Sequence, residues 1–97
     1  MIRLAYSGHA VADLERLAAF LHDEAPAMAT PTARLITSAL DILRAHPLIG
    51  RIVERDWREL VISRGRTGYI ALYRYDEHLD QVVVHAIRHQ REAGYQP

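Results

Sequence analysis

The sequence predicts an α+β fold in the order β-α-α-β-β-β, with two N-terminal helices packed on a curved, mainly antiparallel four-stranded sheet. Two stretches carry apolar residues at spacings of three and four, which is the helical pattern. Four short stretches have the alternation or the β-branched content of strands, and polar or glycine-bearing turns separate the last three. Such a meander leaves one sheet face for the helices to cover and the other open for a partner.

The chain is expected to open with a strand and a helix. Ile2, Leu4 and Tyr6 alternate with smaller or polar residues, which predicts a strand that ends at Ser7. The first helix is expected over residues 9–25, where one apolar stripe consists of Val11, Leu14, Leu17, Ala18 and Leu21. Pro26 is expected to end this helix.

A second helix is expected to begin at Thr30, whose hydroxyl can cap it, with Pro31 at the first helical position. It should end near Ala45 or His46, because Pro47 disfavours helix in the residue before it. The two helices then lie antiparallel across a short loop.

The second half of the chain predicts a β-meander. Residues 57–63 and 69–75 form a hairpin around a glycine-bearing turn at residues 64–68. After a polar turn, residues 81–87 include a valine run that is typical of a strand buried on both faces.

Composition predicts one cytoplasmic domain over residues 1–97. A chain of 97 residues supports one core. It has no cysteine for a disulfide or a thiolate zinc site, and no apolar run approaches the roughly 20 residues that cross a bilayer. All 12 basic residues are arginines, and they balance 12 acidic residues, so the formal net charge of zero argues against a dedicated nucleic-acid binder.

Five stretches taken in order resemble the RelE/ParE toxin superfamily, and more closely its ParE-like, plasmid-stabilisation branch. They span nearly the whole chain: Ala12-Asp13-Leu14 with Leu17 and Phe20-Leu21; His46-Pro47-Leu48-Ile49-Gly50-Arg51; Arg58-Glu59-Leu60-Val61-Ile62; Gly68-Tyr69-Ile70-Ala71-Leu72-Tyr73-Arg74; and Ile87-Arg88-His89-Gln90-Arg91-Glu92-Ala93-Gly94-Tyr95. The resemblance implies the toxin of a type II toxin-antitoxin system that needs no cofactor. It also implies a ParD-like antitoxin that folds on binding, and contact with operator DNA only through that antitoxin.

The resemblance leaves the target open, because the superfamily includes both DNA gyrase inhibitors similar to ParE and ribosome-dependent mRNA endonucleases similar to RelE and YoeB. The endonucleases carry an arginine in the middle of the third strand, a position that falls here near Ile70 or Ala71, although Arg74 follows. We therefore expect a gyrase poison. The alternative is an endonuclease that uses Arg88, His89, Arg91 and Tyr95, and a third hypothesis is an inert remnant that serves only as a co-repressor with its antitoxin.

Candidate contact residues follow from this picture. The expected target contacts are arginines and one histidine on the strands and the hairpin tip: Arg64, Arg66, Arg74, Arg88, His89 and Arg91. The alternative for the last three is a solvated strand edge paired with Glu92. Phe20 and Ile42 lie off the main apolar stripes, so we expect them to bind the antitoxin.

The aromatic and histidine residues predict structural roles. Tyr69, Tyr73 and Tyr75 share one strand face, where packing is a commoner role than base stacking. His85 and His89 are predicted to share a strand face, but strand rise puts them about 13 Å apart, too far to ligate one zinc ion. No metal site is expected.

Overall fold

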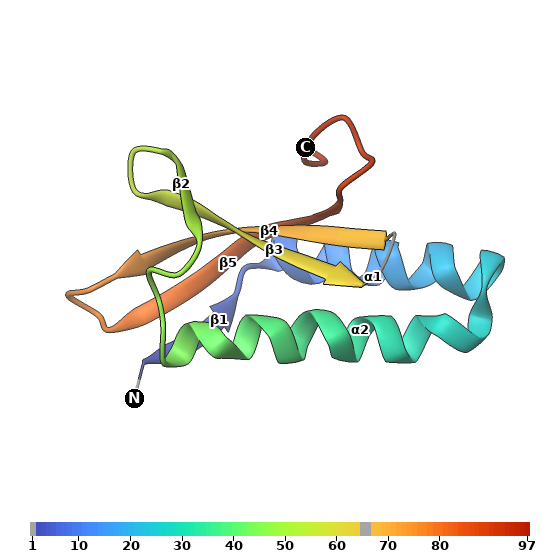
Figure 1. The fold of residues 1–97 in the computed structure, drawn as a ribbon, viewed down its shortest axis with the longest axis horizontal. Helices are drawn as coiled ribbons and strands as arrows, with labels where there is room; N and C mark the ends of the chain where they lie inside the picture. The colour runs from blue at the N-terminus through green and yellow to red at the C-terminus, as the bar shows by residue number, and fades with distance from the viewer. Residues whose placement is uncertain (1, 65–66) are drawn as a thin grey trace.

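The computed structural model describes residues 2–64 and 67–97, with the elements in the predicted order and one additional strand (Figure 1). The elements are β1 (Arg3–Tyr6), α1 (Gly8–Glu24), α2 (Pro26–Asp41), the 3₁₀ turn η1 (Ile42–Arg44), β2 (Arg51–Glu54), β3 (Trp57–Arg64), β4 (Thr67–Asp76) and β5 (Gln81–His89). Within the described part of the chain, no helix is both long and apolar enough to cross a membrane.

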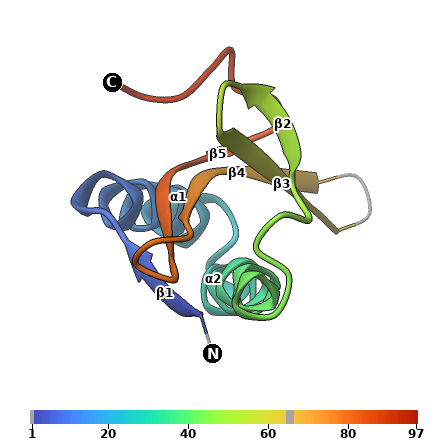
Figure 2. The ribbon, with the colours of Figure 1, turned by 90° about the vertical axis from the view of Figure 1, so that its left-hand side faces the viewer.

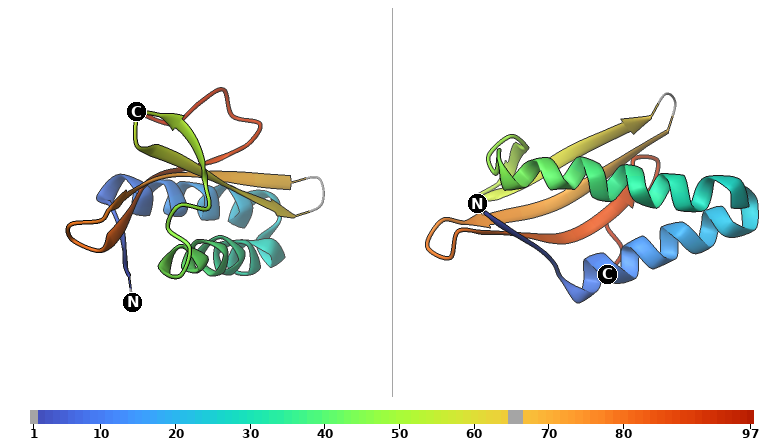
Figure 3. Two further views of the ribbon diagram at one scale, coloured as in Figure 1. Left: turned by 60° about the vertical axis from the view of Figure 1, so that its left-hand side comes forward. Right: turned by 90° about the horizontal axis from the view of Figure 1, so that it is seen from below.

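The strands form one sheet in the order β1-β5-β4-β3-β2, in which β1 runs parallel to β5 and the other pairs are antiparallel. Both helices lie side by side and antiparallel under one face, as the view from below shows (Figure 3). The end-on view places β2 and the chain after β5 on the other side of the sheet (Figure 2). We call that side the open face.

The prediction of four strands is wrong by one, because β2 was not expected. All four of its residues are exposed, and it pairs only with the first residues of β3. A strand without a buried face has no apolar alternation to detect, so the sequence pattern could not reveal it.

The core lies between the helices and the sheet, and it confirms the packing role of the tyrosines. Tyr73 is completely buried and Tyr69 nearly so, while Tyr75 packs against the core cluster. Leu17 of α1 and Leu40 of α2 bring the helical stripes onto this face.

The predicted start of the second helix is wrong. α2 begins at Pro26, immediately after α1, so Pro26 both ends one helix and occupies the first turn of the next, where its missing N–H costs nothing. Pro31 lies inside α2. A proline there removes one backbone hydrogen bond at a cost of about 3 kcal/mol, which the packing of α2 must offset. The predicted end holds more closely, since helical backbone continues through η1 to Arg44.

Two predictions about β5 are wrong, and a β-bulge explains the first of them. Tyr73 pairs with Val84 and Leu72 with Ala86, so His85 is the extra residue. Val84 is buried on the helix side, so His85 faces the open side by ordinary alternation, and its imidazole lies against Trp57. The extra residue inverts the alternation after it, so His89 packs against Tyr69 on the helix side. The two histidines therefore do not share a face. The strand is also not buried on both faces, because Val83 is only half-buried.

Candidate interaction surface

The N-terminal part of α1 continues the hydrogen bonding of β5 where β1 ends. The Ser7 hydroxyl donates to the carbonyl oxygen of His85 over 3.1 Å. The Asp13 carboxylate is 3% exposed and accepts the buried amide N–H of Ile87 over 2.8 Å. Side chains from a helix thus satisfy a strand edge that the short β1 leaves open.

The chain beyond β5, residues 90–97, folds back over the open face, and we call it the C-terminal segment (Figure 1). Arg88 fixes its start by donating to the carbonyl oxygen of Glu92 over 2.9 Å. Glu92 also pairs with Arg16 of α1 at 2.8 Å. Further along, the hydroxyl of Tyr95 donates to Glu59 over 2.6 Å, and its ring lies 5.2 Å from the Arg88 guanidinium carbon.

Glu59 is the buried acid of the open face, with 8% of its surface exposed. Burial alone would raise the pKa of this carboxyl, but hydrogen bonds from Tyr95 and Arg51 outweigh that effect and lower it below its ordinary value. The same arrangement raises the pKa of Tyr95, chiefly through burial and then through its bond to the carboxylate. Glu59 is therefore ionised at neutral pH and Tyr95 keeps its proton.

The four candidate catalytic residues do not converge. Arg88 and Tyr95 meet on the open face, as described above. His89 lies on the helix side, with its ring 5.2 Å from that of Tyr69, and its Nδ1 accepts the backbone N–H of Arg91. His89 and Arg91 line a largely apolar groove of about 490 Å³ at the end of α1, together with Phe20, Leu17 and Leu21.

The candidate antitoxin contacts are both exposed, but they lie far apart. Phe20 is 64% exposed in the last two turns of α1, beside the start of α2. Ile42 is 44% exposed at the other end of α2. A helix of 16 residues is about 24 Å long, so one short groove cannot contain both side chains.

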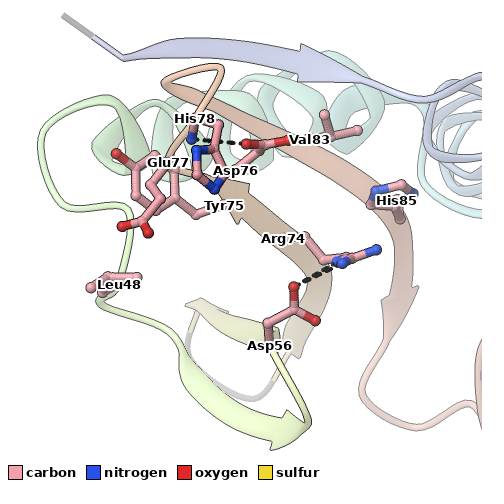
Figure 4. Close-up of a pocket in the computed structure, with 9 residues that line it drawn as sticks. All are labelled: Leu48, Asp56, Arg74, Tyr75, Asp76, Glu77, His78, Val83 and His85. Carbon is pink, nitrogen blue, oxygen red and sulfur yellow. Dashed lines mark hydrogen bonds and ion pairs between the residues drawn. The ribbon is translucent and has the colours of Figure 1, made fainter.

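A cavity of about 560 Å³ opens on the open face between the β2–β3 turn and the β4–β5 turn (Figure 4). Arg74 of β4 projects into it and donates two hydrogen bonds to Asp56, the shorter at 2.7 Å. The guanidinium also lies 4.9 Å from the ring centre of Trp57, whose ring meets His85 edge-on at 4.8 Å. These contacts orient the Arg74 guanidinium toward Asp56 and Trp57.

The electrostatics of this cavity disfavour a polyanion. The side-chain bonds from Arg74 lower the pKa of Asp56, whereas burial first and the nearby charge of Arg74 second lower the pKa of His85. His85 is thus neutral at pH 7. One arginine faces three acids of the lining, Asp56, Asp76 and Glu77, which leaves a formal charge of −2.

Two predicted target contacts cannot be placed. Arg66 lies outside the described residues. Arg64 ends β3, but its side chain also lies outside the described part of the structure.

The sequence interpretation missed the roles of Glu59, Asp56 and His85 on the open face. Glu59 occupies an alternating position within a strand, which is a weak signal of a paired polar residue on the open face. The side on which His89 lies depends on the bulge at His85, and no sequence pattern marked that bulge.

The chain matches one protein family and is similar to a curated toxin over most of its length. Residues 4–94 match the family described as ParE toxin of type II toxin-antitoxin system, parDE. Toxin RelE3 of Caulobacter vibrioides is 38% identical over 80 residues, which are 82% of this chain and 85% of that protein.

Two solved structures share the fold. One is the chromosomal ParDE toxin-antitoxin system from P. aeruginosa, with a TM-score of 0.78 and 22% identity over 92% of this chain and 96% of that one. The other is the RelBE2 toxin-antitoxin complex from Mycobacterium tuberculosis, with a TM-score of 0.58 and 21% identity over 94% and 93% of the two chains.

Proposed function

This chain belongs to the ParE toxin family of type II toxin-antitoxin systems, and on that premise we propose that it arrests growth by binding and poisoning DNA gyrase. It acts without bond-breaking chemistry of its own, and a cognate antitoxin silences it. One observation carries the choice of a binding inhibitor: the candidate catalytic side chains are divided between two faces of the sheet.

RNA cleavage needs a base, an acid and a cationic donor around a single phosphate. The Arg88 guanidinium donates to backbone carbonyl oxygens, and the Tyr95 hydroxyl donates to Glu59, so internal bonds engage both groups. His89 cannot join them from the helix side of the sheet. This division supports binding rather than catalysis.

The charge of the open face supports a protein target. Phosphate neutralisation supplies most of the affinity for a nucleic acid, and it needs a basic surplus. The cavity around Arg74 has a formal charge of −2, and the whole chain has a charge of zero. A protein surface is a better match than ribosomal RNA.

We propose that the antitoxin binds along the helices and enters the groove where α1 meets the end of β5. The groove beside Phe20 is apolar, and Arg16, His89 and Arg91 contribute polar atoms to its wall. An amphipathic or extended antitoxin segment can insert an apolar side chain there. Since Ile42 lies at the far end of α2, a segment that reaches both residues must follow the helices for about 24 Å.

The second candidate function is a RelE-like, ribosome-dependent mRNA endonuclease. It is favoured by the grouping of Glu59, Arg88 and Tyr95 within one polar centre, since these residue types can supply a base, a cation and an acid. This endonuclease hypothesis differs from the one based on the sequence, because it gives His89 no catalytic role.

Expression without antitoxin separates the candidates. We expect growth arrest with a DNA-damage response, and loss of supercoiling activity when purified toxin is added to gyrase. Arg74→Ala should weaken both effects, while Arg34→Ala, at an exposed position on α2, should leave them unchanged. Both variants are first checked for a wild-type unfolding curve.

Codon-periodic mRNA ends with fully active gyrase would refute the proposal and support the endonuclease. The absence of growth arrest would support the inert remnant.

A further inference from the structure

The side chain of His9 joins three parts of the molecule. His9 lies in the first turn of α1, and its Nε2 is 2.7 Å from the carbonyl oxygen of Gln96 in the C-terminal segment. Its Nδ1 is 3.2 Å from the carbonyl oxygen of His85 in β5 and 3.3 Å from the Asp13 carboxylate. Both ring nitrogens therefore face oxygen acceptors.

A neutral imidazole carries one N–H and one lone pair, so it can donate a hydrogen bond to an oxygen on only one side of the ring. The other nitrogen would then point its lone pair at an oxygen. The imidazolium ion has two N–H donors and satisfies both sides. We infer that His9 is a proton-operated clasp, which holds the C-terminal segment against α1 and β5 when protonated and releases it when neutral.

The surroundings of His9 favour the charged ring. The bond to the Gln96 carbonyl raises its pKa most, followed by the negative charge of Asp13, and the backbone oxygens of His85 and Pro97 add smaller increases. Together these effects exceed the opposing effect of burial. Arg16 lies 3.6 Å from Asp13 and takes up part of its charge, while Glu92 pairs with Arg16. From β5 only the His85 backbone faces the ring, because the His85 imidazole is on the open face.

The direction of the pH effect follows from this raised pKa. An unfolded histidine has a pKa of about 6.5, so the clasp is complete below that pH. It is lost as the pH rises through the higher value of the folded protein. The segment has two other anchors, the Arg16–Glu92 pair and the hydrogen bond from the Tyr95 hydroxyl to Glu59. Burial alone would raise the pKa of both carboxyls, but hydrogen bonds lower it, so Glu92 and Glu59 stay charged over this range.

Release would change the open face. Tyr95 directly precedes Gln96, so a segment freed beyond Glu92 takes the Tyr95 hydroxyl away from Glu59. Glu59 and Arg88 would then face solvent. The inference does not depend on whether gyrase or the ribosome is the target.

Nuclear magnetic resonance of the full chain tests the clasp. We expect backbone order parameters of residues 93–96 to fall from about 0.85 to below about 0.6 between pH 5.5 and 8.5. The midpoint of this transition should coincide with the midpoint of the His9 imidazole titration. His9→Gln should abolish this transition and leave the segment mobile at both pH values. His22→Gln, at the exposed histidine in the last turn of α1, should behave as wild type.

Two results would overturn the inference. One is a His9→Gln variant that keeps the pH-dependent loss of order. The other needs no variant: imidazole ¹⁵N shifts of the wild type that show a neutral His9 while residues 93–96 remain ordered.

Discussion

Asp13 is the residue whose replacement tests most directly how α1 supports β5. Its carboxylate is buried and accepts the Ile87 amide N–H, which no strand satisfies. Asp13→Ala leaves this donor unpaired inside the protein. A buried hydrogen bond to a charged group contributes about 1.5–3 kcal/mol, and an unsatisfied buried donor costs a similar amount. Burial of the carboxylate itself costs free energy, and the variant no longer has this cost. We therefore expect a net loss of about 2–3 kcal/mol of unfolding free energy.

The matched variants separate the hydrogen bond from other effects. Asp13→Asn keeps a neutral acceptor and should lose only about 1 kcal/mol. Glu15→Ala removes an exposed acid from the same helix and should change stability by less than about 0.5 kcal/mol. Urea unfolding followed by circular dichroism measures all three. The reasoning fails if Asp13→Ala matches Glu15→Ala, or if Asp13→Asn is as unstable as Asp13→Ala.

Two further predictions concern Gly50 and Tyr95. A Cβ at Gly50 would lie 2.6 Å from the Tyr73 ring and 2.7 Å from the Glu59 carbonyl oxygen, so Gly50→Ala should lower the free energy of unfolding in urea by about 1–3 kcal/mol. Gly8→Ala should not destabilise the protein, because the space around Gly8 is open. Equal stability of the two variants would contradict this reasoning. Tyr95→Phe removes a hydrogen bond that lowers the pKa of Glu59 in the folded protein. A lowered carboxyl pKa stabilises the protein above the unfolded pKa of about 4.3, and this stability is lost as the pH falls through the folded pKa. Between pH 3 and 7 the variant should therefore lose less unfolding free energy on acidification than the wild type, and an unchanged loss would contradict this reasoning.

Elements that bury one face were predictable from the sequence. The stripe of α1 and the alternation of Tyr69, Tyr73 and Tyr75 depend on local periodicity. The fold follows the predicted stripe at Leu14 and Leu17, but the prediction was wrong at Val11, which is exposed. The end of the second helix was also predictable, because Pro47 acts on the residue next to it. These are effects within a few residues of one another.

The features that were missed depend on contacts distant in sequence. Pro31 is tolerated because α2 packs along α1, and local proline rules do not include that packing. The His85 bulge depends on pairing between β4 and β5, and residues 90–97 are placed by side chains from α1 and β3. The sequence identified Arg88, His89, Arg91 and Tyr95 as one candidate group, but only tertiary structure could show that Glu59 joins Arg88 and Tyr95 and that His89 does not.

These distant contacts meet at the outer edge of β5, where α1 takes the place of a strand. A neighbouring strand would pair with the backbone N–H and C=O groups of this edge whatever its side chains were. Here the side chains of Ser7, Asp13 and Arg16 make these hydrogen bonds instead. Arg16 also holds the C-terminal segment through Glu92. The stability of β5 and the covering of the open face therefore share the same side chains, so substitutions on this face of α1 should change both together. Residues such as Arg34, on the exposed side of α2, should change neither.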